Sequence, residues 1–282
     1  MSVDDLVITA TSSVHWRTDD PPDVLPWLES RKSRKFMGKQ DQLAVIAAGQ
    51  ALAAAGLRAP EARPAMGLYL TIGHIPFMRE DIDAIAGESV DAAGAFDIQR
   101  FATEGVAQVN PLLTFRCLPN MPAYHVSQNF GLRGRYALAY PGVAQAACNL
   151  MHALDDLRGG RVAQALVGGV ADQHNFLVGF HFERNAQRRL LVREDKAAML
   201  VIEHREGARA RGARVLGRWG RVQASLSSAA DAAMALQHVG AADLFAWAHA
   251  QVQRGDALQR EFVAQGLEGA RVLAEFVPED DA

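Results

Sequence analysis

The 282-residue sequence contains only two cysteines, Cys117 and Cys148, and they stand far apart. Neither belongs to a CxxC pair, and neither has a pair of histidines at metal-ligand spacing near it. The pattern excludes a disulfide framework and gives no support for a zinc site. We therefore expect no metal ion and a reducing compartment.

Long hydrophobic runs and an excess of one charge are also missing. No stretch approaches the roughly 18 uninterrupted apolar residues of a membrane span, and the N-terminus MSVDDLVITATSS has no basic region of the kind a signal peptide needs. The net charge is -3 with both signs interspersed, whereas a nucleic-acid surface needs clustered basic residues. Arg209, Arg211 and Arg214 are interpreted as a solvated face. We expect a cytoplasmic protein that binds neither membranes nor nucleic acid.

The first third of the chain alternates strand and helix patterns. Leu6 to Ala10 is short, apolar and rich in β-branched residues, which predicts a strand, as does Met66 to Ile72. Between them, Asp41 to Ala55 has helical periodicity, no proline, an initial Asp suited to capping, and Gly56 as its end. This succession is typical of layered α/β proteins.

The middle third continues the pattern with sharper punctuation. We predict a helix after Pro119 that ends at Gly131 to Gly134, and a strand at Tyr136 to Tyr140. Pro141 and Gly142 make a turn, after which Gln145 to Leu157 is predicted as a helix. The spacing is interpreted as placing four of its residues on one face: Cys148, Met151, Leu154 and Leu157.

The last part opens with a buried strand. Val162 to Val167 is predicted as that strand, and Gly168 and Gly169 as a tight turn after it that delivers Asp172. The remaining predictions are strands at Lys196 to Glu203 and Gly269 to Val277, and a helix within Ala229 to Arg254. His174 and His181 follow the Gly-Gly pair, where α/β proteins place site residues, although a lone loop histidine is more often a surface residue.

Several segments in this order resemble the β-ketoacyl synthases. They are KFMGKQDQLAVIAAGQALAAAGL (35–57), LPNMPAYHVSQNFGLRG (118–134), ALVGGVAD (165–172) and EDKAAMLVIEHREGARARGARVLGRW (194–219). The resemblance implies the α/β/α/β/α layered thiolase fold with a truncated or degenerate C-terminal half. It also implies an N-terminal synthase-like domain over 1–222, with a shortened segment over 223–282 that completes the fold. No cofactor is implied.

The resemblance also locates the turn where the synthases carry their nucleophilic cysteine. A thiolate at a helix N-terminus is nucleophilic near neutral pH and forms an exchangeable thioester. Depending on where a one-residue gap is placed, the corresponding position here is Val143, Ala144 or Gln145, and none of these forms a thioester. None of the nine histidines is followed by the Gly-Thr signature of the family's catalytic pair. The resemblance therefore implies a chain without catalytic residues.

Three polar or sulfur-bearing residues have two interpretations each. Gln145 resembles the Gln that stands at this turn in chain-length factors, or it is only a helix-forming residue at a helix start. Cys148 and Cys117 are either relocated nucleophiles or, as is more usual for helix and apolar-run cysteines, small buried hydrophobic residues.

A further group lies where the family approaches its dimer interface and the end of its acyl pocket. These residues are Leu112, Leu113 and Phe115, and bulky side chains there would limit chain length because a close-packed wall leaves no room for another acetate unit. Ordinary core packing is the alternative for each of them. We list them with Cys117, Gln145 and Cys148 as candidate acyl-channel or interface residues.

The resemblance implies a chain-length-factor-like subunit in type II polyketide, aryl-polyene-like or fatty-acid-related biosynthesis. Its partners would be a catalytic ketosynthase in a heterodimer, or a second copy in a homodimer, and an acyl carrier protein. Two alternatives remain open at this stage: a truncated acyltransferase or thioester hydrolase that uses Cys148 or Cys117, and an acyl-binding regulatory module. The resemblance does not imply how the residues after 222 complete the fold.

Overall fold

The computed structural model describes residues 5–62, 65–75, 77–183, 193–226, 240–254, 260–266 and 269–279. The strands are β1 Leu6–His15, β2 Gly67–Ile72, β3 Tyr136–Ala139, β4 Gln164–Ala171, β5 Lys196–His204, β6 Gly217–Leu226, β7 Glu261–Gln265 and β8 Ala270–Pro278. The helices are α1 Lys39–Ala54, α2 Arg79–Gly87, α3 Ile98–Arg100, α4 Leu113–Cys117, α5 Met121–Phe130, α6 Val143–Arg158, α7 Phe176–Glu183, α8 Arg205–Ala210 and α9 Asp243–Arg254. Short 3-10 or π turns are η2 Leu25–Trp27, η3 Arg31–Phe36, η4 Pro60–Ala62, η5 Phe101–Gly105 and η6 Val106–Gln108.

The predicted elements are present, with shifted ends. The Asp41 carboxylate accepts the backbone N–H of Gly38 at 2.7 Å, so α1 begins two residues earlier than predicted. α5 ends at Gly131, whose φ of 62° is the left-handed conformation that glycine adopts without strain. The predicted helix within 229–254 is α9 in its described part, and residues 229–239 lie outside the described residues. β6 and β7 were not predicted.

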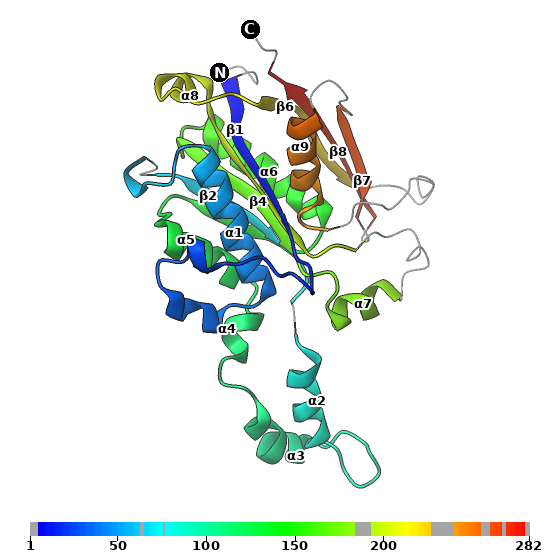
Figure 1. Ribbon diagram of the computed structural model, residues 1–282. Coiled ribbons are helices and arrows are strands. Elements are labelled where there is room, and N and C mark those ends of the chain that lie inside the picture. The colour runs from blue at the N-terminus through cyan, green and yellow to red at the C-terminus, as the bar shows by residue number, and fades with distance from the viewer. Residues whose placement is uncertain are drawn as a thin grey trace.

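The strands form one sheet in the order β3-β2-β4-β5-β1-β6-β8-β7. β2 pairs in parallel with β3 and β4, whereas β5 pairs antiparallel with β4 and β1. All six residues of β2 are buried, as expected for a strand covered on both faces. One face packs against α1 and α5, and the other face packs against α6 and α9 (Figure 1).

The sheet bends sharply between β1 and β6. β3 and β7 are its two ends, which in a flat sheet would lie about 34 Å apart at roughly 4.8 Å per strand, yet α6 contacts both. β1 and β6 share a single residue pair, Ile8 with Gly217. Side chains of the last three strands, such as Trp219 and Phe276, join the same core as α6 and α9. These two helices are therefore enclosed between two parts of the sheet, in an α/β/α/β order.

This arrangement confirms the expected α/β thiolase-like fold with a reduced second half. Four of the five layers of the complete fold occur among the described residues, and the second sheet consists of β6, β8 and β7. The residues after 222 thus supply part of β6, α9 and two strands. Position 222 lies inside β6, and a division of the chain there stays a prediction.

The glycine pair of β4 has a different role from the one predicted. Gly168 and Gly169 lie within the strand and do not form a turn after it. A Cβ on Gly169 would lie 2.0 Å from the carbonyl oxygen of Ala241, just before α9. The missing side chains therefore let the start of α9 approach the sheet, because any larger residue would collide with that backbone.

Residues 77–110, which contain α2, α3, η5 and η6, project from the rest of the protein, and we call them the arm (Figure 1). The arm is inserted between β2 and α4. It exposes the side chains of Met78, Phe96, Ile98 and Val106. Among the described residues, no helix has the length and apolar character needed to cross a bilayer.

Candidate functional site

The carboxyl ends of the parallel strands β2, β3 and β4 meet at one edge of the sheet, which we call the carboxyl edge. In open α/β sheets this edge is where ligands bind. α1 begins there, because the Gln40 side chain donates to the carbonyl oxygen of His74 beyond β2 at 2.9 Å. α6 also begins there, directly after β3. The edge therefore holds both helix starts that the sequence singled out.

The turn before α6 carries no nucleophile. The Tyr140–Pro141 peptide bond is cis, and Gly142 has a φ of 101°, a conformation accessible only to glycine. The side chains of Val143 and Ala144 are buried in the core, and Gln145 is half-buried. The N-cap residue of α6 is Gly142, which has no side chain to cap the first backbone N–H groups. The first two residues of α6 are thus aliphatic and packed into the core, and Gln145 follows them.

Cys148 is exposed, so its interpretation as a buried hydrophobic residue was wrong. Along an α-helix, each step of three residues falls about 60° short of a full turn. Three such steps separate Cys148 from Leu157, so the two side chains point to opposite sides of the helix. Leu157 is buried and Cys148 faces outward. Cys117 is half-buried at the end of α4, where burial raises its thiol pKa to about 11 and nearby Asp81 adds to the effect. Such a thiol is a poor nucleophile at neutral pH.

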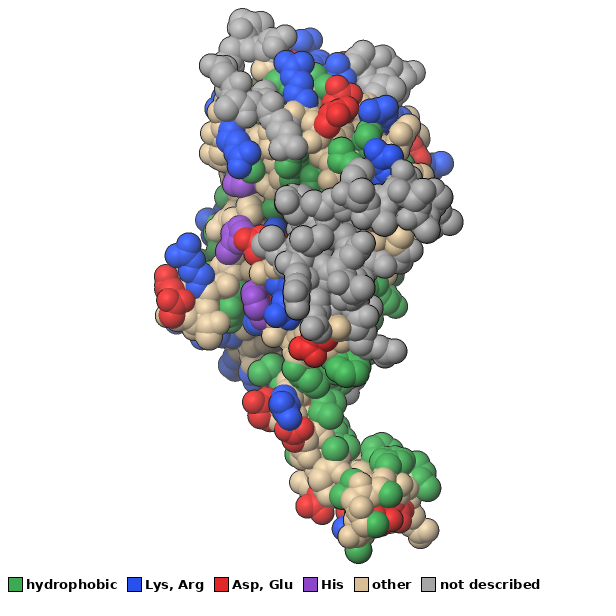
Figure 2. Space-filling model, turned by 90° about the vertical axis from the view of Figure 1, so that its right-hand side faces the viewer, with side chains coloured by type: hydrophobic (Ala, Val, Ile, Leu, Met, Phe, Trp, Pro, Cys, Tyr) green, Lys and Arg blue, Asp and Glu red, His purple; other side chains and the backbone are tan. Residues whose placement is uncertain are grey.

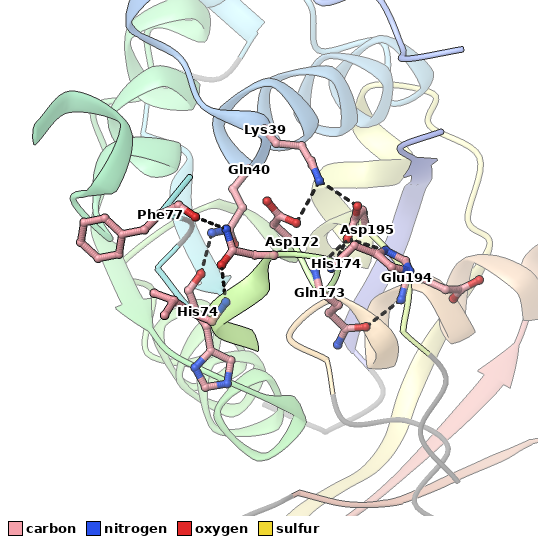
Figure 3. A network of polar contacts seen from close by, with 11 residues as sticks. Lys39, Gln40, His74, Phe77, Asp172, Gln173, His174, Glu194 and Asp195 are labelled. Atoms are coloured by element: carbon pink, nitrogen blue, oxygen red, sulfur yellow. Dashed lines mark hydrogen bonds and ion pairs between the residues drawn. The ribbon is translucent and has the colours of Figure 1, made fainter. Parts of the chain in front are cut away.

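A network of charged side chains occupies the carboxyl edge on the side of α1 (Figure 3). The Lys39 ammonium lies 3.0 Å from Asp172 Oδ1 and 2.9 Å from Asp195 Oδ2. The other oxygen of Asp195 accepts the backbone N–H groups of residues 173 and 174, and lies 3.0 Å from Nδ1 of His174. The network thus joins α1, the end of β4 and the start of β5.

The two buried carboxylates of this network titrate differently. Burial acts to raise the pKa of Asp195, but the hydrogen bonds from Lys39 and from the His174 backbone outweigh it, so the pKa is lowered. The pKa of Asp172 is raised by burial, which the Lys39 charge only partly offsets. Burial acts to lower the pKa of Lys39, but the two nearby carboxylates outweigh burial, so the pKa of Lys39 is raised. Among the described residues, the hydrogen bonds and ion pairs of this network involve no cysteine, serine or threonine side chain. The network orients His174 and ties three elements together.

Sequence reasoning found only part of this network. The position of Asp172 after the Gly-Gly pair and the place of His174 were noted, and the structure brings His174 into the network with its side chain half-exposed. Lys39 and Asp195 were missed, because nothing in their local sequence signals a partner more than 130 residues away. The side chain of His181 lies outside the described residues.

A groove lies on the face of the protein that carries α1 and α5. It has a volume of about 610 Å³ and is bounded by η3, Phe115 of α4 and one side of α5. Phe115 is 44% exposed and packs edge-on against Phe36, with ring centroids 5.5 Å apart. Leu113 is buried and Leu112 is half-buried. Of the candidate wall residues of α4, only Phe115 lines this groove.

The candidate residues fall into two groups on opposite faces of the sheet. Residues 112 to 117 lie beside α5, which packs in the core of α1. Gln145 and Cys148 belong to α6, which packs in the core on the other face. The residues that line the groove include none from α6. Within this chain, the structure therefore does not bring all the candidates into one channel.

Residues 10–189, well over half of the chain, match the family model described as β-ketoacyl synthase, N-terminal domain. The chain belongs to the β-ketoacyl synthase family. The match ends before the 194–219 segment that also resembles this family. A comparison with the curated proteins finds no match.

Solved structures share the ketosynthase fold at low sequence identity. One is a type II PKS acyl-carrier protein in complex with its ketosynthase bound to the hexaketide (12% identity, TM-score 0.70, 98% of this chain and 100% of that chain). Another is a β-ketoacyl synthase from Burkholderia phymatum STM815 (16%, TM-score 0.70, 98% and 100%). A third is the ishigamide ketosynthase/chain length factor (19% identity, TM-score 0.59). That match covers 80% of this chain and 64% of that chain. At these identities the likeness concerns the fold alone.

Proposed function

We propose that this chain is a non-catalytic, chain-length-factor-like partner of a β-ketoacyl-ACP synthase in type II polyketide, aryl-polyene-like or fatty-acid-related biosynthesis. The observation that carries the proposal is the start of α6, where Val143 and Ala144 are packed into the core and Gln145 follows them. The fold around the missing nucleophile is retained, which is expected of a subunit that supports the chemistry of a partner.

The edge strand β3 supports the proposed heterodimer. It pairs with β2 on one side only, and its residues are half-buried or exposed, whereas those of β2 are all buried. Tyr136 is 73% exposed and Tyr140 is 55% exposed. An open strand edge beside exposed aromatic rings is a template for pairing with another chain. The exposed Cys148 lies on α6, which packs against this strand.

The arm provides a second surface for the same partner. Figure 2 shows hydrophobic side chains gathered on the arm where it projects from the body, and its exposed apolar residues include Phe96 and Ile98. Apolar surface held away from the body of the chain is costly unless another molecule covers it. In the proposed complex the arm lies against the ketosynthase and contributes one wall of its acyl channel.

The basic segment η3 supports an acyl carrier protein as a further partner. Lys32 lines the groove together with Phe36, and the exposed Arg31, Arg34 and Lys35 belong to the same short helix. No salt bridge joins these four residues to any described residue. A carrier protein presents its acyl chain on a phosphopantetheine group, which is attached through a negatively charged phosphodiester. Unpaired cations beside an apolar groove are suited to such a ligand.

Co-expression with a ketosynthase subunit tests the heterodimer. We expect the two chains to co-purify, and Tyr136→Glu to weaken the complex by about tenfold or more, since a charge would be buried at the strand edge. Tyr124→Glu is the matched control: Tyr124 is 52% exposed but lines the groove, so it should leave ketosynthase binding intact and weaken carrier binding. A stably monomeric chain that co-purifies with no ketosynthase would contradict the proposal.

The exposure of Cys148 favours one alternative, an acyltransferase or thioester hydrolase that uses this thiol. Incubation with an acyl-thioester followed by intact-mass measurement separates the two functions. The proposal predicts no stoichiometric adduct. An adduct that disappears in Cys148→Ala would establish the alternative. We expect no adduct at Cys117, because its thiol pKa is raised to about 11.

A further inference from the structure

A small cavity at the base of the arm is lined by both polar and apolar residues. The chain enters the arm after Gly73 and leaves it through Arg116 to Pro119, and both segments line the cavity together with the first residues of α1. Its free volume is about 10 Å³, close to what one water molecule occupies in such a site. The two segments that connect the arm to the rest of the protein therefore meet the start of α1 around this cavity.

Two buried polar atoms in the residues that line this cavity have no hydrogen-bond partner among the described residues. They are Oε1 of Gln40, an acceptor, and Nε of Arg116, a donor. Leaving a buried polar group unsatisfied costs about 1 to 3 kcal/mol, and native proteins rarely tolerate it. One donor and one acceptor around the same cavity form a complementary pair of sites.

Neither side chain is free to turn toward another partner. The Gln40 amide nitrogen donates to the His74 carbonyl oxygen at 2.9 Å, which holds Oε1 on the opposite side. The terminal nitrogen of Arg116 lies 3.3 Å from Asp81 Oδ1 of the arm. The backbone also lies close to the Gln40 amide, because a Cβ on Gly73 would lie 3.1 Å from Gln40 Oε1.

We propose that this cavity binds one structural water molecule, which donates to Gln40 Oε1, accepts from Arg116 Nε and reaches the Asp41 carboxyl group. The water links α1 to the segment by which the chain leaves the arm. Through the hydrogen bond between Gln40 and His74, it also links the segment by which the chain enters the arm. It acts as a latch that fixes the direction of the arm. This latch does not depend on the identity of any partner chain.

Crystallography of the full-length chain is the direct test. At a resolution where single waters are visible, we expect one ordered water within hydrogen-bond distance of both Gln40 Oε1 and Arg116 Nε. An empty cavity, or a direct hydrogen bond between the two side chains, would overturn the proposal.

Hydrogen exchange of the arm tests the latch without crystals. Arg116→Lys keeps the charge facing Asp81 but removes the Nε–H donor, and we expect amide exchange in residues 77–110 to become about threefold faster or more. Gln40→Leu should do the same. Gln42→Leu is the matched control, because Gln42 lies on the same helix but does not line the cavity. Equal exchange in all four proteins, with folding verified by circular dichroism, would refute the latch.

Discussion

Two helices, α1 and α6, start at the carboxyl edge of the same sheet, and their surroundings differ. At α1, Lys39 lies between two buried carboxylates and Asp41 caps the first turn. At α6, the N-cap residue is a glycine without a capping side chain, and the first two residues are aliphatic and packed into the core. One start is held by charges and the other by apolar packing.

The difference separates the requirements of the fold from those of catalysis. The network at α1 positions α1, β4 and β5 relative to one another, so its loss would disturb the fold itself. The start of α6 requires only glycine at the turn and small side chains that fill the core. The proposed partner role needs both helix starts to be rigid and neither to be reactive.

Replacing Lys39 should give the largest loss of stability. Lys39→Met leaves Asp172 and Asp195 buried without their counter-charge, and removing one member of a buried pair costs about 3 kcal/mol or more. Urea denaturation measures the change in the free energy of unfolding. Lys32→Met, at an exposed residue of η3, should change it little, and an equal loss in both variants would contradict the role of the network.

Gly142→Ala tests the α6 start and should have a smaller effect. The φ of 101° and ψ of 173° at this position are essentially limited to glycine, so alanine should cost about 2 kcal/mol in thermal or urea unfolding. Gly207→Ala serves as the control, because an added Cβ there meets nothing within 4 Å and alanine favours the helix. A stable Gly142→Ala variant would show that the turn tolerates another conformation.

The smallest effect, measured over a single pH unit, is a pH dependence due to Asp41. Burial raises its carboxyl pKa to about 8, although the Gly38 hydrogen bond acts against this. The folded state therefore keeps a proton that the unfolded chain has lost, so stability is highest below the unfolded pKa of about 4 and falls as the pH rises toward 8. Asp41→Asn should remove this dependence.

The expected difference amounts to about 1 kcal/mol between pH 6 and pH 7. Urea titrations of the wild type and of Asp41→Asn at the two pH values measure it. Parallel curves for the two proteins would mean that Asp41 is ionised in the folded state, and that the α1 start is more polar than its burial indicates.

Local sequence patterns predicted most of the elements but not their neighbours across the sheet. α1, α5 and β5 agree with prediction to within about two residues, because apolar periodicity and glycine ends are local signals. Arg211 was interpreted as part of a solvated face, whereas it binds the buried Glu203 and the carbonyl oxygen of Ala55. That partnership spans three elements, and no local pattern carries it.

By itself, the sequence determined the α/β order of the elements, the family and the absence of a cysteine at the turn before α6, since each is a matter of residue type in chain order. Only the tertiary structure decided that Cys148 faces outward, that Gly169 makes room for α9 and that Lys39 joins two distant carboxylates. These features depend on which surfaces meet when the helices pack on the two faces of the sheet. Burial and charge pairing are properties of such contacts, and they come into being only when segments far apart in the chain are packed together.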